Sequence, residues 1–326
     1  MSRKAAAILI ACVCAFACIA LAACSAPVQS RSSESISAEA NDVASKSKEA
    51  PSTDPFYVLV VGNDSRTGTV EIDQPYYADG SARSDTTMLV RVDPKNYVID
   101  IITIPRDTAI NLGDLECKFN EAYHQGGIQA TLEQVELLTG VKPNYYLDTT
   151  FVGFEKFIDA FGGVDVWVPM DMDLQDIVGG SQIYLKEGEQ KLNGPEALVF
   201  ARVRKAIGYV YDDAPEEAYR QVDDRSIVES AIRAVVAGKV PTDVAVKALL
   251  SNCDSNFDSD DLAYYADEFA KNSDKLTIYS ATGPFNGDVG SGGEWLAFRD
   301  EDAWHEIISL ADANQDPNTV YPHPEF

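Results

Sequence analysis

Three segments near the N-terminus decide the fold: VVGNDSR at residues 60–66, ARSDTTMLVRVDP at 82–94 and YVIDIITIPRD at 97–107. Each contains an apolar run with the length and composition of a buried β-strand. The second and third runs flank DPKN at 93–96, a sequence that favours a hairpin turn. The three segments therefore predict neighbouring strands of one sheet.

Charged side chains stand directly beside each of these strands. They are Asp64 and Arg66 after the first strand, Arg83 and Asp85 before the second, and Arg106 and Asp107 after the third. Strands buried in a sheet would bring these groups together at the sheet edge, where open α/β sheets bind ligands. Carboxylates hold metal ions and arginines clamp phosphate, so the combination predicts a diphosphate site.

The remaining chain alternates between strand-like and helical segments. Strands are expected near 145–148, 164–169 and 275–282, and helices at about 129–140, 151–161, 222–237, 242–251, 259–271 and 301–312. Another helix is expected to begin at the Asn193 cap and run through Arg204, whereas KFNEAYHQGG at 118–127 is expected to be a connection. This alternation predicts an α/β sandwich around a mostly central sheet, formed by one domain at 56–312.

The N-terminus has the layout of an export signal. Arg3 and Lys4 precede an apolar run at 5–23, which ends in Leu-Ala-Ala-Cys with Cys24 as the expected lipidation site of a cleaved lipoprotein signal (1–24). A retained transmembrane anchor is the alternative. Both place the domain outside the cell at the membrane, after a disordered linker at 25–55. A disordered tail is expected at 313–326.

Net charge narrows the possible binding partners, and the cysteine content bears on disulfide and metal sites. The 326 residues carry a formal charge of −26, which argues against general binding of nucleic acid or anionic membranes. Cys117 and Cys253 are the cysteines outside the export signal, and we expect them to form a disulfide; two separate buried thiols are the alternative. The three histidines show no metal-ligand spacing.

With these residues laid out, the chain resembles the LytR-CpsA-Psr family of bacterial cell-envelope enzymes from about residue 56 to 312. The resemblance rests on several motifs in the family's order: GNDSR, RSDTTMLVRVDP, IPRDT, KFNEAYHQGG, the pattern FxGFxKxIDxFGGVxVxVP at 151–169, LNGPEALVFARVR, and the closing TGPFNG and WLAFRDED. It implies a three-layer α/β/α sandwich with a mixed central sheet and a groove for a polyprenyl chain.

The resemblance also implies a phosphotransferase. Such an enzyme moves a glycopolymer from a polyprenyl-pyrophosphate carrier to peptidoglycan or a surface protein, with Mg²⁺ or Mn²⁺ as cofactor. Phosphoryl transfer depends on positioning and charge neutralisation, which a metal and arginines supply. The alternatives are a non-catalytic binder of lipid-linked glycans, a polyprenyl-pyrophosphate hydrolase (or such a side activity), and a transcriptional attenuator. An exported acidic chain without a DNA-binding motif argues against the last.

Residue by residue, the resemblance implies that Asp64 and Asp85 hold the metal. The expected pyrophosphate-binding residues are Arg66, Arg83, Arg106, Arg202, Arg204, Arg220 and Arg225, and the expected catalytic residues are Arg106, Asp107, Arg202 and Arg204. Asp107 is expected either to orient Arg106 or to act as the base. The sequence departs from the family in AYRQVDDRSIVES at 218–230, where Asp223 and Asp224 intrude and Gln221 lies too early for the usual Arg-Gln pair.

Overall fold

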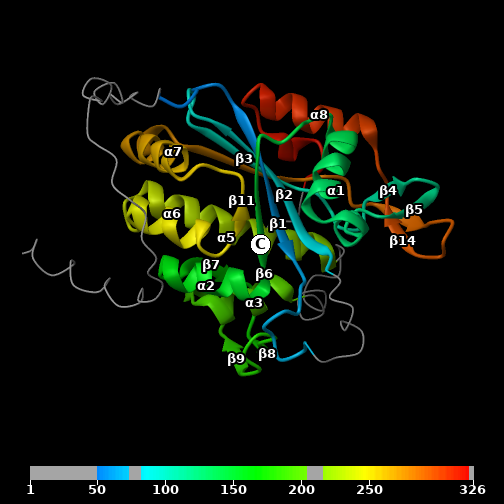
Figure 1. Ribbon diagram of the computed structural model, residues 1–326, viewed down its shortest axis with the longest axis horizontal. Coiled ribbons are helices and arrows are strands. Elements are labelled where there is room, and N and C mark those ends of the chain that lie inside the picture. The colour runs from blue at the N-terminus through cyan, green and yellow to red at the C-terminus, as the bar shows by residue number, and fades with distance from the viewer. Residues whose placement is uncertain (1–49, 73–81, 204–215, 323–326) are drawn as a thin grey trace, which may run out of the picture. The chain divides into compact units, whose positions relative to one another are not determined.

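The computed structural model describes residues 50–72, 82–203 and 216–322 (Figure 1). Residues 51–326 form one compact unit. The export signal with Cys24, the linker up to residue 49, and Arg204 lie outside the described residues. Within the described part of the chain, no helix is both long enough and apolar enough to cross a bilayer.

A six-stranded mixed sheet forms the centre of the domain, in the order β11-β6-β1-β2-β3-β12. The strands are β1 (Phe56–Asn63), β2 (Ser84–Asp93), β3 (Val98–Thr103), β6 (Tyr145–Thr150), β11 (Asp254–Ser255) and β12 (Thr277–Thr282). The pairs β1–β2 and β2–β3 are antiparallel, whereas β1–β6 and β3–β12 are parallel. The predicted hairpin at 93–96 is confirmed, because β2 and β3 pair directly across it.

Helices cover both faces of the sheet (Figure 1). On one face, Leu59 and Val61 of β1 pack in a cluster with Val135 of α1 (Glu121–Thr139) and with Trp304 of α8 (Glu301–Asp312). On the other face, Val58 packs in a cluster to which α5 (Glu216–Val236) and α7 (Ser259–Lys271) contribute. Alternate residues of one strand thus enter opposite cores, and the predicted α/β sandwich with a mixed sheet is confirmed.

A third apolar cluster joins the remaining helices to small hairpins. It contains side chains of α2 (Phe151–Phe161), α3 (Gly194–Arg202), β7 (Val164–Val168), β8 (Met172–Gln175), β9 (Gln182–Leu185), β10 (Gly188–Leu192) and α5. Helix α6 (Thr242–Leu250) packs next to it. Two further hairpins, β4–β5 (Ala109–Leu112, Leu115–Lys118) and β13–β14 (Gly287–Val289, Trp295–Ala297), were not anticipated from the sequence.

The helix boundaries around the sheet edge follow local signals. Thr150 caps α2 by accepting a hydrogen bond from the amide of Gly153 at 3.1 Å, and α2 ends at Gly162 with φ of 95°. Asn193 and Glu196 form a reciprocal capping box at the start of α3. Helix α3 ends at Arg202, earlier than expected, because Val203 has extended backbone angles.

The segment expected to connect strands at 118–127 is partly helical. Helix α1 begins at Glu121, and the non-helical backbone of Gly126 and Gly127 kinks it before the predicted portion starts. The two glycines favoured a loop in the sequence, but glycine also occurs at a kink between two helical segments.

The expectation of a disordered C-terminal tail is wrong for residues 313–322. Asn314 accepts a hydrogen bond from buried Arg91 at 2.8 Å and donates one to Asp93 at 3.1 Å. The short helix at Pro317–Thr319 buries Pro317, and Val320 packs against the core that contains Trp304. Partners that lie more than 200 residues earlier in the chain order this segment. Residues 323–326 lie outside the described chain.

The expected disulfide is not present. Cys117 and Cys253 are both free thiols. Cys117 lies on β5 and packs at the edge of the α1–α8 core, whereas Cys253 follows α6 and hydrogen-bonds to Thr149 of β6. Burial raises the pKa of Cys117 and raises that of Cys253 to about 11, which lowers the fraction of thiolate at neutral pH for both. The alternative of two separate thiols is the one that the structure supports.

Candidate active site

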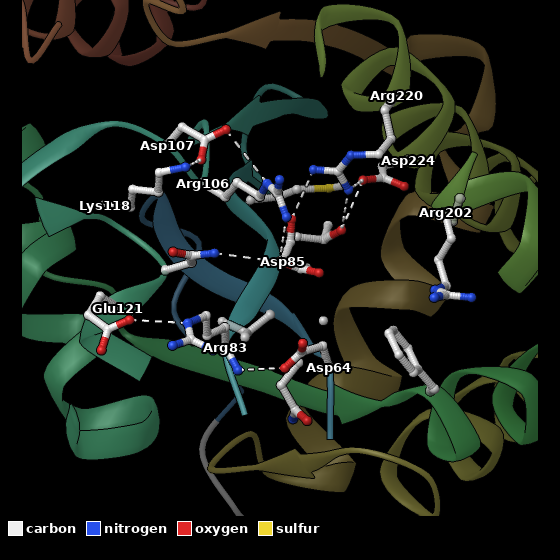
Figure 2. Close-up of a pocket in the computed structure, with 18 of the residues that line it drawn as sticks. Asp64, Arg83, Asp85, Arg106, Asp107, Lys118, Glu121, Arg202, Arg220 and Asp224 are labelled. Atoms are coloured by element: carbon white, nitrogen blue, oxygen red, sulfur yellow. Dashed lines mark hydrogen bonds and ion pairs between the residues drawn. The ribbon is translucent and has the colours of Figure 1, made fainter. Parts of the chain in front are cut away.

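A cavity of about 950 Å³ opens at the end of the sheet where β1 ends and β2 begins. Its walls come from these strands, from the segment after β3, from the first residue of α1, and from α2, α3 and α5. Predicted site residues in its lining are Asp64, Arg66, Arg83, Asp85, Arg106, Asp107, Arg202 and Arg220. Figure 2 shows Asp64, Arg83, Asp85, Arg106, Arg202 and Arg220 around one space, reached from separate elements.

Asp64 directly follows β1 and Asp85 lies on the adjacent strand β2, and both line the cavity. The backbone amide of Arg83 donates to Asp64 Oδ1 at 2.7 Å, which fixes the orientation of that carboxylate. Burial raises the pKa of Asp64, and the negative charge of Asp85 raises it further. Two carboxylates whose negative charges repel each other form a donor set suited to a divalent cation, which completes its shell with phosphate oxygens and water. The residues therefore fit a Mg²⁺ or Mn²⁺ ion.

Arg106 and Asp107 form a chain of ion pairs that leads to Asp85. Arg106 Nη1 lies 2.9 Å from Asp85 Oδ1, and Arg106 Nε lies 3.7 Å from Asp107 Oδ2. The other Asp107 oxygen lies 2.9 Å from Lys118 Nζ. Because two cations hold Asp107, the geometry favours its role in orienting Arg106 over a role as a base.

Arg66 and Arg83 both follow Asp64 in the sequence, and each pairs with an acidic side chain. Arg83 Nε donates to Glu121 Oε2 at 3.1 Å. Arg66 Nη1 donates to the backbone carbonyl of Asp64 at 2.7 Å, and its Nε lies 3.3 Å from Glu71. These contacts hold both guanidiniums beside Asp64.

Two arginines contact the ring of Phe151, which lies at the start of α2. The guanidinium carbons of Arg66 and Arg202 each lie 5.0 Å from its centroid. Arg202 enters the cavity from the last turn of α3, opposite the strands. Cation–π attraction to one ring therefore brings two of the predicted phosphate-binding residues to the same place.

Arg220 and Arg225 have different surroundings on α5. Arg220 Nη2 donates to the backbone carbonyl of Asp85 at 3.0 Å, within the cavity wall. Arg225 does not line the cavity; its side chain is buried against β3 and β12, where it donates to Thr103 and Ser280 at 2.8 Å each. The prediction that Arg225 binds pyrophosphate is therefore wrong, because the helical turn points it toward the sheet.

Several lining residues were missed in the interpretation of the sequence: Lys118, Asn120, Glu121, Phe151 and Asp224. Lys118, Asn120 and Glu121 belong to the KFNEAYHQGG motif, so the motif itself was the signal, although it was interpreted as a connection. Asp224 was noticed only as an intrusion into a family pattern. No local feature marks Phe151 as more than a helix residue.

The other part of the cavity is apolar. Its lining includes Val60, Met88, Phe154, Leu198, Ile227 and Val228, which come from β1, β2, α2, α3 and α5. The cavity therefore joins a cluster of cations and carboxylates to an apolar space between the sheet and the helices. An amphiphilic molecule with an anionic head and a hydrocarbon tail matches this division.

Comparison with known proteins finds a matching family model and several similar enzymes. The LytR_cpsA_psr family model matches residues 25–308. A curated relative, the polyisoprenyl-teichoic acid–peptidoglycan teichoic acid transferase TagV of Bacillus subtilis (strain 168), is 39% identical over 157 residues, which are 46% of this chain and 38% of TagV. TagU of Bacillus mycoides (strain KBAB4), which has the same enzyme name, is 30% identical over 56% of this chain and 53% of TagU.

Other matches extend further along both chains. TagU of Bacillus cereus (strain AH820) is 27% identical over 265 residues, which are 79% of this chain and 78% of that protein. Among solved structures, TagV of B. subtilis superposes with a TM-score of 0.63 at 27% identity, covering 82% of this chain and all of that one. TagT bound to LI-WTA superposes with a TM-score of 0.61 at 22% identity, covering 80% and 92%, and shows the same fold.

Proposed function

Because the chain belongs to the LytR-CpsA-Psr family, we propose that it transfers a polyisoprenyl-linked glycopolymer to peptidoglycan outside the cell membrane. The donor is a glycan on a polyprenyl-pyrophosphate carrier, and a cell-surface protein is the second acceptor class to test. Cys24, as a lipidation site or as part of a retained anchor, would keep the domain at the membrane where the carrier lies.

One observation carries the proposal: carboxylates and arginines from separate elements line the same cavity as a set of apolar side chains. The pyrophosphate would bind between Arg83 and Arg106 on the strand side and Arg202 and Arg220 on the helix side. The prenyl chain would lie along Met88, Leu198, Ile227 and the other apolar residues. Apolar side chains and several guanidiniums in one cavity favour a lipid pyrophosphate over a lipid without pyrophosphate or a pyrophosphate without lipid.

Transfer breaks a phosphoanhydride bond of the donor and forms a phosphoester bond to the acceptor. The acceptor hydroxyl forms a bond to the sugar-linked phosphorus, the bond from that phosphorus to the bridging oxygen breaks, and polyprenyl phosphate leaves with that oxygen. The leaving phosphate takes the hydroxyl proton, since Asp107 is held by Lys118 and Arg106. A divalent cation on Asp64 and Asp85 would neutralise phosphate charge when bound.

The protein's own cations complete this neutralisation. Arg106 is positioned by Asp85 and Asp107, and Arg83 by Glu121, so their guanidiniums need little rearrangement when charge develops on the phosphate oxygens. Preorganised donors of this kind are typically worth about 3 kcal/mol each in transition-state stabilisation.

The test uses the domain from residue 50, which contains the whole compact unit. It is incubated with a polyprenyl-pyrophosphate oligosaccharide, Mg²⁺ and peptidoglycan fragments, and products are followed by mass spectrometry. Coupled glycan together with polyprenyl phosphate is expected, and both should be lost with EDTA or in Asp85→Ala. Asp274→Ala is the matched control, because Asp274 is exposed and does not line the cavity.

Other outcomes separate the alternatives. Release of polyprenyl phosphate without coupled product, across peptidoglycan and protein acceptors, would indicate a hydrolase. Tight donor binding without any turnover would show a binding protein instead of a transferase.

A further inference from the structure

Helix α5 runs along the cavity from its charged part to its apolar part. Arg220, Asp224, Ile227 and Val228 all line the cavity, and their spacing of four, three and one residues places them on one helical face. Arg220 and Asp224 therefore lie at the junction, where the lipid-side phosphate of a prenyl pyrophosphate would meet its hydrocarbon chain. This assignment rests on the proposed function.

Asp224 puts a carboxylate at this junction, beside the apolar residues Ile227 and Val228 of the same helix. Its Oδ2 accepts from Thr86 Oγ1 at 2.9 Å and lies 3.2 Å from Arg220 Nη1. Both charged side chains are nearly inaccessible, with 5% of Arg220 and 4% of Asp224 exposed. Figure 2 shows Asp224 beside the guanidinium that also reaches toward Asp85.

This arrangement gives Arg220 two competing partners. Without substrate, Asp224 neutralises Arg220 and holds it over the backbone carbonyl of Asp85. A phosphate placed at the junction must share Arg220 with Asp224 and also lies near the negative charge of Asp224. At an effective dielectric constant of about 20, unit charges about 4 Å apart interact strongly enough to change binding at least tenfold.

We propose that Asp224 is a positioning residue that acts through Arg220 to speed release of the prenyl phosphate product. Before transfer, the pyrophosphate is held at both phosphates, by the arginines beside Asp64 and Asp85 as well as by Arg220. After the bridging bond breaks, the prenyl phosphate retains only the junction contacts and carries a charge close to −2 at neutral pH. Asp224 then recovers Arg220 and repels the product.

The experiment measures binding and turnover separately in the domain from residue 50. Binding of farnesyl phosphate and farnesyl pyrophosphate is measured by calorimetry for the wild type and for Asp224→Asn, which keeps a hydrogen-bonding group beside Thr86 but removes the charge. The matched control is Glu229→Gln, which removes the charge of another α5 carboxylate that pairs with an arginine four residues away, outside the cavity lining.

Asp224→Asn is expected to bind farnesyl phosphate about tenfold more tightly, with a smaller gain for the pyrophosphate, whereas Glu229→Gln stays within about twofold of wild type. In turnover of the lipid-linked glycan, KM and the steady-state kcat should both fall in Asp224→Asn, while the single-turnover rate stays near wild type. A purely structural role for Asp224 would instead lower both rates and weaken binding.

Unchanged or weaker binding of farnesyl phosphate in Asp224→Asn overturns this inference and leaves the proposed function standing. Failure of the wild type to bind either prenyl compound overturns the proposed function, and this inference with it. If Asp224→Asn does not fold, the neutral and smaller Asp224→Ser carries the same expectation.

Discussion

Arg106 Nη1 lies 2.9 Å from Asp85 Oδ1, so an arginine that follows β3 is paired with a carboxylate at the start of β2. The antiparallel pairing of the two strands makes this contact, because the end of β3 meets the beginning of β2. The pair links the expected metal-binding and phosphate-binding functions at one point of the cavity.

Arg106→Ala should reduce single-turnover transfer about 100-fold, since it removes a preorganised donor to the phosphate and the ion pair with Asp85. Arg106→Lys should recover only part of the rate, because lysine lacks the planar fork. Arg233→Ala, at an exposed arginine paired with Glu229, is the control and should leave the rate unchanged. A loss of less than fivefold in Arg106→Ala would contradict the assigned role.

Phe151→Leu should raise the KM for the lipid pyrophosphate about fivefold, because Arg66 and Arg202 would both lose the ring that they contact. Leucine keeps most of the buried apolar volume, so the unfolding temperature should change little. Phe298→Leu, at an exposed phenylalanine, is the matched change outside the cavity lining. Unaltered KM in Phe151→Leu would show that the arginines are held by their other contacts.

Truncation after Asp312 should destabilise the domain, because it removes Asn314 from buried Arg91 and Val320 from the core. Loss of a partner for a buried polar group alone costs about 1–3 kcal/mol. Deletion of residues 323–326 keeps all of these contacts and is the control. Chemical denaturation that gives equal stability for both truncations would show that the segment contributes nothing.

The stability of the domain should fall as the pH rises from about 5 to about 8. Burial beside Asp176, to which Glu155 hydrogen-bonds, raises the pKa of Glu155 to about 8. In this pH range the folded state retains a proton that the unfolded chain has lost, so the free energy of unfolding decreases with increasing pH. Glu155→Gln imitates the protonated form and should reduce this slope in urea denaturation. An identical slope in wild type and variant would exclude Glu155 as the cause.

Alkylation of the unfolded domain without reductant should modify two cysteines, Cys117 and Cys253, because both are free. In the folded domain at neutral pH the reaction should be slow, since burial raises the pKa of both thiols. Mass spectrometry before and after alkylation measures both quantities. A mass without added groups after unfolding would show a disulfide and contradict the structure.

Local sequence determined most of the secondary structure and the family. Local signals act over a few residues, so their effect can be predicted without knowledge of the fold. They are the apolar runs that begin at Phe56 and within 82–107, the Thr150 and Asn193 caps, and the glycines at 140 and 162. The sequence also indicated Asp64, Arg83, Asp85 and Arg106 as neighbours, because each stands at the end of a strand in the same sheet.

Only the tertiary structure decided which charged side chains share the cavity. Arg220 and Arg225 lie five residues apart on one helix. The orientation of that helix places Arg220 in the cavity lining and Arg225 against the sheet, where it donates to Thr103. Contacts between distant segments likewise decide four other features. They are the pairing of Arg83 with Glu121, the contact of two arginines with Phe151, the ordered C-terminal segment and the separation of the cysteines. Such contacts follow from how helices pack on the sheet, which no local pattern encodes.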